Sequence, residues 1–161
     1  MSPIGMYRAY HRFYQRGWMK LAFWMYRLHR LIYACEIHPA AELGPGCQIP
    51  HSVGIVIGPE VRIGRLCFIG QGVTLGYRYP GPREPVRGDG NPVVGDRVVI
   101  GAGAKVFGAI TIGDHVLIGA NSVVTRSVPA DHIAVGVPAV IRPRRRPSPA
   151  WETADDSSLM V

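Results

Sequence analysis

The stretch IPHSVGIVIGPEVRIGRLCFIG, residues 49–70, decides the fold. Ile57, Ile63 and Ile69 stand six positions apart, and each is followed by glycine. The same spacing extends through most of the chain on both sides. The full series is Ile37, Leu43, Ile49, Ile57, Ile63, Ile69, Leu75, Val94, Ile100, Val106, Ile112, Ile118 and Val124. A six-residue period, with one large aliphatic residue and a glycine suited to a sharp corner, is typical of a solenoid of short strands.

The repeat predicts an all-β solenoid over residues 36–141. Three six-residue units would form one triangular coil, and successive coils would stack about 4.8 Å apart, the spacing of neighbouring strands. The thirteen aliphatic positions account for a little over four coils. A second column, four positions after the aliphatic residues, is expected to point inward too. It comprises Ala41, Cys47, Val53, Val61, Cys67, Val73, Val98, Ala104, Ile110, Val116, Ser122 and Val128.

One interval inside the repeat is not six residues long. The step from Ile49 to Ile57 is eight residues and contains His51. Two extra residues in an otherwise regular repeat predict a bulge. His51 is therefore the first candidate for chemistry, because an imidazole changes its charge near neutral pH.

Charge is concentrated at the two ends of the chain, whose formal net charge is +7. Residues 1–35 contain six basic side chains and no acidic one, whereas residues 37–141 contain eight basic and seven acidic side chains. A nearly neutral repeat argues against a nucleic-acid-binding protein. Three cysteines without a CxxC pair argue against a disulfide framework or a thiolate metal site, and they favour a cytoplasmic location.

The segment before the repeat, residues 1–35, is expected to be helical and amphipathic. On a wheel of about 100° per residue, the basic side chains of residues 6–35 fall on one side and most aromatic side chains on the other. Gly17 is a natural point of division into two helices. Two roles stay open. The segment caps the solenoid or contacts a neighbouring subunit, or it makes peripheral contact with the anionic inner face of a membrane.

Two further segments leave the repeat. Residues 77–92, YRYPGPREPVRGDGNP, form a long insertion of a kind that is usually functional. Residues 142–161 are expected to form a basic, disordered tail.

Several stretches resemble the serine acetyltransferase branch of the hexapeptide acyltransferases. They are IHPAAELGPGCQIPHSVGIVIGPEVRIG (37–64), GQGVTLG (70–76), NPVVGDRVVIGAGAKVFGAITIGDHVLIGANSVV (91–124) and AVGVPAVI (134–141). The resemblance implies a left-handed parallel β-helix, a homotrimer with active sites between adjacent subunits, and acetyl-CoA as co-substrate without a metal. His51 matches the family's general base, and Glu36 stands where the family has an aspartate that pairs with the base. A base is required because an alcohol attacks a thioester poorly until its proton is removed.

The resemblance also assigns the co-substrate side of the site. Ala102 and Ala120 match alanines whose backbones contact the pantetheine arm of CoA in relatives. The arginines suit the phosphates, because a guanidinium binds them through paired hydrogen bonds. The candidates for binding the cofactor are Ala102, Ala120, Thr125, Arg126, Gly136, Pro138 and Arg142.

The chain departs from the family on the acceptor side. Pro50 precedes the base where the family has aspartate, and Gly90-Asn91-Pro92 replaces the family's Arg-His-Pro. Loss of this serine-binding arginine and histidine predicts a sugar acceptor, either a nucleotide sugar or a lipid-linked glycan, as in polysaccharide-associated O-acetyltransferases. Asn91 and Asp89 are the candidates for binding the acceptor.

The sequence therefore predicts an acetyl-CoA-dependent O-acetyltransferase that transfers acetyl directly within a ternary complex. Two alternatives stay open: a serine O-acetyltransferase of shortened form, and a non-catalytic hexapeptide scaffold. A metal-dependent hydratase is disfavoured, because the histidines of the repeat lack ligand spacing on neighbouring coils. These histidines are His38, His51, His115 and His132.

Overall fold

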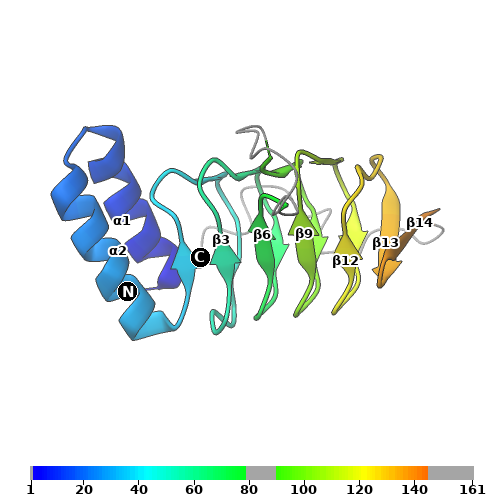
Figure 1. The fold of residues 1–161 in the computed structure, drawn as a ribbon, viewed down its shortest axis with the longest axis horizontal. Helices are drawn as coiled ribbons and strands as arrows, with labels where there is room; N and C mark the ends of the chain where they lie inside the picture. The colour runs from blue at the N-terminus through cyan, green and yellow to red at the C-terminus, as the bar shows by residue number, and fades with distance from the viewer. Residues whose placement is uncertain (1, 79–89, 145–161) are drawn as a thin grey trace, which may run out of the picture.

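The computed structural model describes residues 2–78 and 90–144. Two helices lie across one end of a long stack of short strands, and a hairpin closes the other end (Figure 1). Most of the predicted insertion, residues 79–89, and the predicted tail from residue 145 lie outside the described residues.

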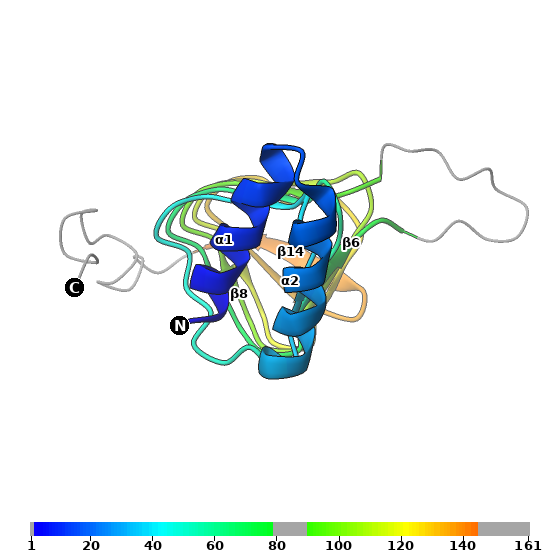
Figure 2. The ribbon, with the colours of Figure 1, turned by 90° about the vertical axis from the view of Figure 1, so that its left-hand side faces the viewer.

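The strands form three faces of a triangular solenoid, seen along its axis in Figure 2. The first face has the order β1 (Glu36–Ile37), β3 (Val56–Ile57), β6 (Thr74–Gly76), β9 (Lys105–Phe107) and β12 (Val123–Val124). The second has β2 (Glu42–Leu43), β4 (Arg62–Ile63), β7 (Val93–Val94) and β10 (Thr111–Ile112). The third has β5 (Phe68–Ile69), β8 (Val99–Ile100), β11 (Leu117–Ile118), β13 (His132–Gly136) and β14 (Ala139–Pro143).

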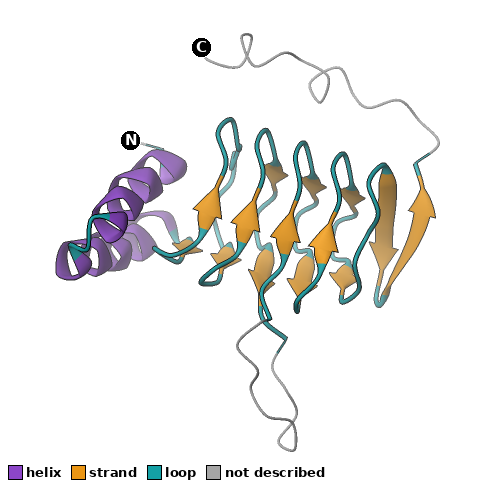
Figure 3. Ribbon diagram, turned by 90° about the horizontal axis from the view of Figure 1, so that it is seen from above, coloured by secondary structure: helices purple, strands orange, loops and turns teal. Residues whose placement is uncertain are grey.

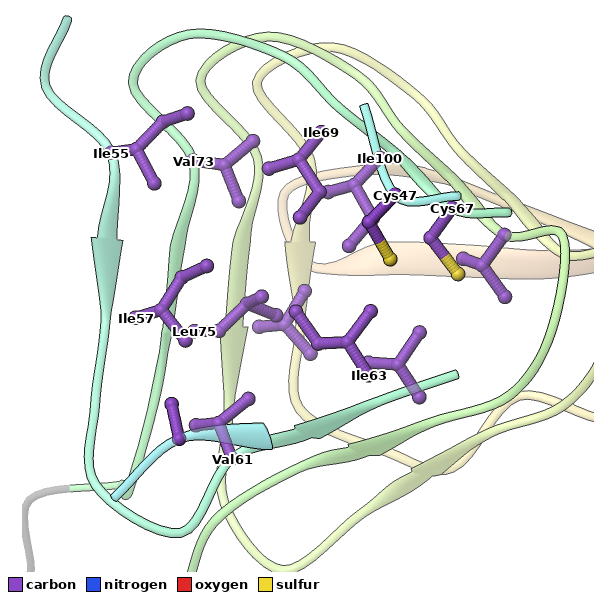
Figure 4. Packing of buried hydrophobic residues seen from close by; sticks show 14 of the residues in the cluster. Cys47, Ile55, Ile57, Val61, Ile63, Cys67, Ile69, Val73, Leu75 and Ile100 are labelled. Carbon is purple, nitrogen blue, oxygen red and sulfur yellow. The ribbon is translucent and has the colours of Figure 1, made fainter. Parts of the chain in front are cut away.

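The six-residue period sets the core, as the sequence predicted. Every aliphatic residue of the main series is buried except Leu43, which is half-buried. Successive members of the series pair across neighbouring coils, for example Ile57 with Leu75. Figure 4 shows these side chains converging in the interior of the solenoid. Each coil buries its apolar side chains against the coils beside it, which is how a solenoid is stabilised.

One residue of the second column does not point inward. Val53 is 66% exposed, whereas Ile55 is 1% exposed and takes the inward position. The reason is the eight-residue step: the two extra residues shift the register, so that Ile55 aligns with Val73 of the next coil, whose carbonyl accepts from the Val56 amide. The column resumes its regular spacing at Val61.

The N-terminal segment forms α1 (Pro3–Gln15) and α2 (Met19–Tyr33). Gly17, at φ +78°, makes the turn between them. Because the two helices have separate axes, the single helical wheel used for residues 6–35 does not describe how their side chains are distributed. Within the described residues, neither helix combines the length and hydropathy that crossing a membrane requires.

The helix pair covers the first coil through buried tyrosines. The Tyr7 hydroxyl donates to the carbonyl of Ala41 at 2.6 Å, and the Tyr10 hydroxyl donates to the carbonyl of Ile37 at 2.7 Å. Both tyrosines are buried. The pair therefore satisfies carbonyl groups at the end of the solenoid that would otherwise lack partners, and it shields the strand edges.

The other end is closed by a structure that the repeat did not predict. β13 and β14 pair antiparallel, with Gly136 opposite Ala139, whereas all other pairings between strands are parallel among the described residues. Figure 3 shows this hairpin at the end farthest from the helices. β14 reaches Pro143, two residues past the predicted end of the solenoid domain.

Candidate active site

The bulge at His51 is visible in the pairing register of the first two coils. Before it, Gln48 pairs with Phe68, an offset of 20 residues. After it, Val56 pairs with Thr74, an offset of 18 residues. Two extra residues therefore lie in the first coil between these pairs. The His51 side chain is exposed at this bulge.

The bulge is attached to the end of α2. The Ser52 hydroxyl donates to the carbonyl of Tyr33 at 2.9 Å, and the Gly54 amide donates to the carbonyl of Ala34 at 2.8 Å. Ala34 ends the helix in the left-handed conformation, at φ +47°. His51 thus lies on a loop whose following residues are fixed to the helical cap. Ser52 was not among the site residues predicted from the sequence. Its position next to His51 was the only feature that could have indicated a role.

A regular corner continues from the bulge along the solenoid. Gly54, Gly72 and Gly103 each have φ between +69° and +75°, and they stack on one another. A Cβ atom placed on Gly54 would lie 3.4 Å from the Cα of Gly72, and one on Gly72 would lie 3.6 Å from the Cα of Gly103. Asn121 continues this stack at φ +56°.

This corner brings the predicted base and the alanines predicted to contact CoA onto one edge. The Gly72 amide donates to the carbonyl of Val53, the Gly103 amide to that of Gln71, and the Asn121 amide to that of Ala102. We call this edge, which carries His51, Gln71, Ala102 and Ala120 on successive coils, the His51 edge. Gln71 is exposed on it between the bulge and Ala102. Its position between two glycines of the repeat was the signal that could have identified it.

The hairpin joins the far end of the His51 edge. The Gly136 amide donates to the buried Ser122 hydroxyl at 3.1 Å. Gly136 has φ +107°, and the Val137–Pro138 bond is cis. The residues predicted to bind CoA therefore extend from the middle of the His51 edge to the end that the hairpin closes.

A cavity of about 390 Å³ lies at the same end of the solenoid. It brings together three residues predicted to bind the cofactor, Thr125, Arg126 and Pro138, with residues of β12 and β14. Arg142 is exposed on β14 and pairs in register with Ile133, but it does not line this cavity.

Glu36 is held by the second helix. Its carboxylate accepts from the Tyr26 hydroxyl at 2.7 Å and lies 3.3 Å from the guanidinium Nε of Arg30. Burial raises the pKa of Tyr26, and the hydrogen bond to Glu36 acts in the same direction, so the phenol stays protonated and donates. Among the described residues, no hydrogen bond or ion pair joins Glu36 to His51, and their pairing stays a prediction.

The predicted acceptor residue Asn91 lies at a different corner of this chain from His51. Asn91 precedes β7, at the connection between the first and second faces, whereas His51 lies between the third and first faces. Asn91 is near Gly58, and its Oδ1 is buried without a hydrogen-bond partner among the described residues. Asp89 lies outside the described residues. Within the described ranges, no cluster of three or more His, Cys, Asp or Glu side chains is arranged to hold a metal ion.

Comparison with known proteins places this geometry in a family. The family model for the bacterial transferase hexapeptide (six repeats) matches residues 91–126. A serine acetyltransferase of Helicobacter pylori (strain J99) is 44% identical over 135 residues, covering 83% of this chain and 75% of that protein. The chain belongs to the serine acetyltransferase family.

Two further serine acetyltransferases agree. The enzyme of Mycobacterium tuberculosis is 42% identical over 153 residues, covering 92% of this chain and 65% of that protein. A serine acetyltransferase solved in complex with CoA is 38% identical, with a TM-score of 0.78 over 87% of this chain and 55% of that one. The chain thus spans between 55% and 75% of the length of these relatives. The left-handed parallel β-helix expected from the resemblance is confirmed.

The same comparisons correct one prediction. The sugar acceptor, and with it the role in polysaccharide biosynthesis, is wrong, because the relatives that match most of this chain at more than 40% identity are serine acetyltransferases. The inference depended on Gly90 and Asn91, which stand where the family has arginine and histidine. Similarity across more than 80% of the chain, including the bulge, outweighs that local difference.

Proposed function

We propose that this protein is a serine O-acetyltransferase, which transfers acetyl from acetyl-CoA to the hydroxyl of L-serine. The observation that carries the proposal is the His51 edge, on which an exposed imidazole and the CoA-side alanines share one corner of the solenoid. The family membership supports serine as acceptor. The CoA complex of a relative supports acetyl-CoA as donor.

The chemistry requires one base. His51 takes the proton of the serine hydroxyl as its oxygen attacks the thioester carbonyl carbon. The tetrahedral intermediate then collapses, the C–S bond breaks, and the imidazolium returns the proton to the departing thiolate. Acetyl passes directly from sulfur to oxygen within a ternary complex, and the products are O-acetylserine and CoA. Glu36 would stabilise the imidazolium after a change of side-chain rotamer, as a carboxylate does beside other catalytic histidines.

Acetyl-CoA fits the long axis of the edge. Coils stack about 4.8 Å apart, so the edge offers an extended track for a long co-substrate. In the proposal, the thioester lies beside His51 and the pantetheine arm passes Ala102 and Ala120. The nucleotide end then reaches the cavity at Thr125 and Arg126, where the guanidinium meets phosphate.

The proposal includes a homotrimer. His51 and Asn91 lie at different corners of one chain, so a neighbouring copy is needed to bring an Asn91 beside a His51. Val53, next to the base, is 66% exposed, and such an apolar side chain suits a subunit contact. Light scattering on the purified chain would give three times the chain mass; a monomer with full activity would contradict this part of the proposal.

Peripheral membrane contact through residues 6–35 also belongs to the proposal.

The acceptor is tested by product analysis. Purified protein with acetyl-CoA is offered L-serine, L-threonine and L-homoserine separately, and products are identified by mass spectrometry. We expect O-acetylserine, with release of free CoA that depends on serine. Absence of serine-dependent CoA release, with acetyl-CoA binding intact by calorimetry, would overturn serine as acceptor.

A further inference from the structure

The outer surface of α2 carries a stripe of alternating cationic and apolar residues. The buried positions of the helix are Ala22, Tyr26 and His29. On a wheel of about 100° per residue, Lys20, Trp24, Arg27 and Leu31 cluster about 160° away from them. These four residues, here called the outer stripe, are all exposed. The helix pair lies across the end of the solenoid (Figure 1), and the stripe is on the side of α2 opposite its buried positions.

Apolar exposure is concentrated on this helix. Leu31 is 83% exposed and Trp24 is 62% exposed. Half of the large apolar side chains exposed among the described residues lie between positions 18 and 32, which is far denser than the isolated exposure usual on a protein surface. They are Trp18, Met19, Leu21, Phe23, Trp24, Leu31 and Ile32.

The charged side chains of the helix pair itself have one sign. Residues 1–35 contain no acidic side chain, and Arg16, Lys20 and Arg27 are exposed. Tryptophan and long basic side chains suit the boundary between water and lipid, because their apolar parts enter the acyl region while their polar ends stay hydrated. A surface of this kind is attracted to anionic headgroups.

We propose that the outer stripe docks the protein on an anionic lipid bilayer, with α2 lying in the plane of the interface. A second copy is the less suitable occupant: two stripes face to face would bring Lys20 and Arg27 against like charges, with no acidic residue in either helix. The solenoid then extends away from the bilayer, and the His51 edge runs along it toward the hairpin. This docking rests on the peripheral membrane contact proposed above and specifies its residues and lipid charge; it does not depend on the acceptor of the acetyl group.

Vesicle flotation of the full chain tests the proposal. The vesicles are phosphatidylcholine with about 30% phosphatidylglycerol, or phosphatidylcholine alone. We expect partition onto the anionic vesicles, weaker partition onto the neutral ones, and release by salt. The double variant Lys20→Gln/Arg27→Gln should partition about 25-fold less, since each basic residue near an anionic surface contributes about fivefold. The double variant Trp24→Ser/Leu31→Ser should lose at least about tenfold.

Matched controls lie on the solenoid. Arg62→Gln/Arg65→Gln removes the same charge from exposed ion pairs with Glu42 and Asp96, and Val93→Ser removes an exposed apolar side chain. Both controls should bind as the wild type does. All variants should melt as the wild type does and keep its kinetics with serine in the absence of vesicles.

Three results would overturn the docking proposal. The wild type could fail to bind anionic vesicles, or the controls could lose as much binding as the stripe variants. Light scattering could also show that Trp24→Ser/Leu31→Ser lowers the mass of the assembly in solution, which would assign the stripe to a second copy. None of these results would change the expected turnover of serine.

Discussion

The Ser52 hydroxyl donates a hydrogen bond to the carbonyl of Tyr33 at 2.9 Å. This bond joins the bulge that carries His51 to the last residue of α2. The position of the proposed base is therefore coupled to the helical cap as well as to the coil that contains it.

Replacing Ser52 with alanine should lower kcat more than it affects KM. The bond itself contributes about 1 kcal/mol to stability, but a small displacement of a catalytic group can reduce turnover by a factor of about 10 to 100. Steady-state kinetics with serine and urea unfolding measure the two effects. Ser52→Thr keeps the hydroxyl and should restore most of kcat. An alanine variant with normal kcat would mean that the bond only stabilises the fold.

Glu36 offers a second test of the base. Glu36→Gln should keep an acceptor for the Tyr26 hydroxyl but remove the negative charge that would stabilise the His51 imidazolium. We expect kcat to fall on the order of 10- to 1,000-fold, with a change in stability of about 1 kcal/mol. The companion variant Tyr26→Phe separates the two roles, because it removes the hydrogen bond and leaves the charge. Undiminished kcat in Glu36→Gln would restrict Glu36 to its contacts with α2.

Arg126 tests the co-substrate end of the site. Arg126→Gln should raise the KM for acetyl-CoA about tenfold, with the KM for serine unchanged, because a charge-assisted bond to phosphate would be lost. The control is Arg62→Gln, which changes the same kind of residue on the second face. Equal KM values in the two variants would exclude Arg126 from the CoA site.

Acid should destabilise the helical cap through His29. This residue is buried, with Nδ1 3.0 Å from the carbonyl of Cys35 and Nε2 3.1 Å from that of Pro3. Burial lowers the pKa of His29 below its usual 6.5, although the two carbonyls oppose the shift. The unfolded chain therefore binds the proton more readily, so this stability is present above pH 6.5 and is lost as the pH falls through the folded pKa.

The measurement for His29 is the urea midpoint between about pH 7 and about pH 5. In His29→Phe, part of the decrease on acidification should disappear. The rest of the decrease should persist in this variant, because burial lowers the pKa of His38 as well. The control variant His132→Gln, which changes a half-buried histidine at the start of β13, should behave as the wild type does. An identical decrease in His29→Phe and the wild type would contradict this origin of the acid sensitivity.

Much of the fold follows from local sequence because a six-residue period repeats the same packing problem in each coil. The bulge was also predictable, since a change of register is countable. The exposure of Val53 was not, because it depends on where within the eight-residue step the extra residues protrude. The closing hairpin was missed because the six-residue pattern ends before β13 and gives no information beyond it.

The site was less predictable than the fold. The His51 edge needs residues from four coils, and the sequence supplied most of them through family resemblance. Glu36 was expected to face the base, yet Tyr26 and Arg30 on the neighbouring helix hold its carboxylate in this chain. The acceptor was wrongly predicted because the residue types at one loop end do not determine which acceptor the whole site binds.

The most direct test of the proposed mechanism is the serine-dependent turnover of His51→Asn against the wild type, at saturating acetyl-CoA. A general base contributes about 10²- to 10⁴-fold to such a reaction. We predict a loss of kcat in that range, with acetyl-CoA affinity unchanged by calorimetry and no such loss in the control His132→Gln. Turnover of serine by His51→Asn at the wild-type rate would contradict the assignment of His51 as the base.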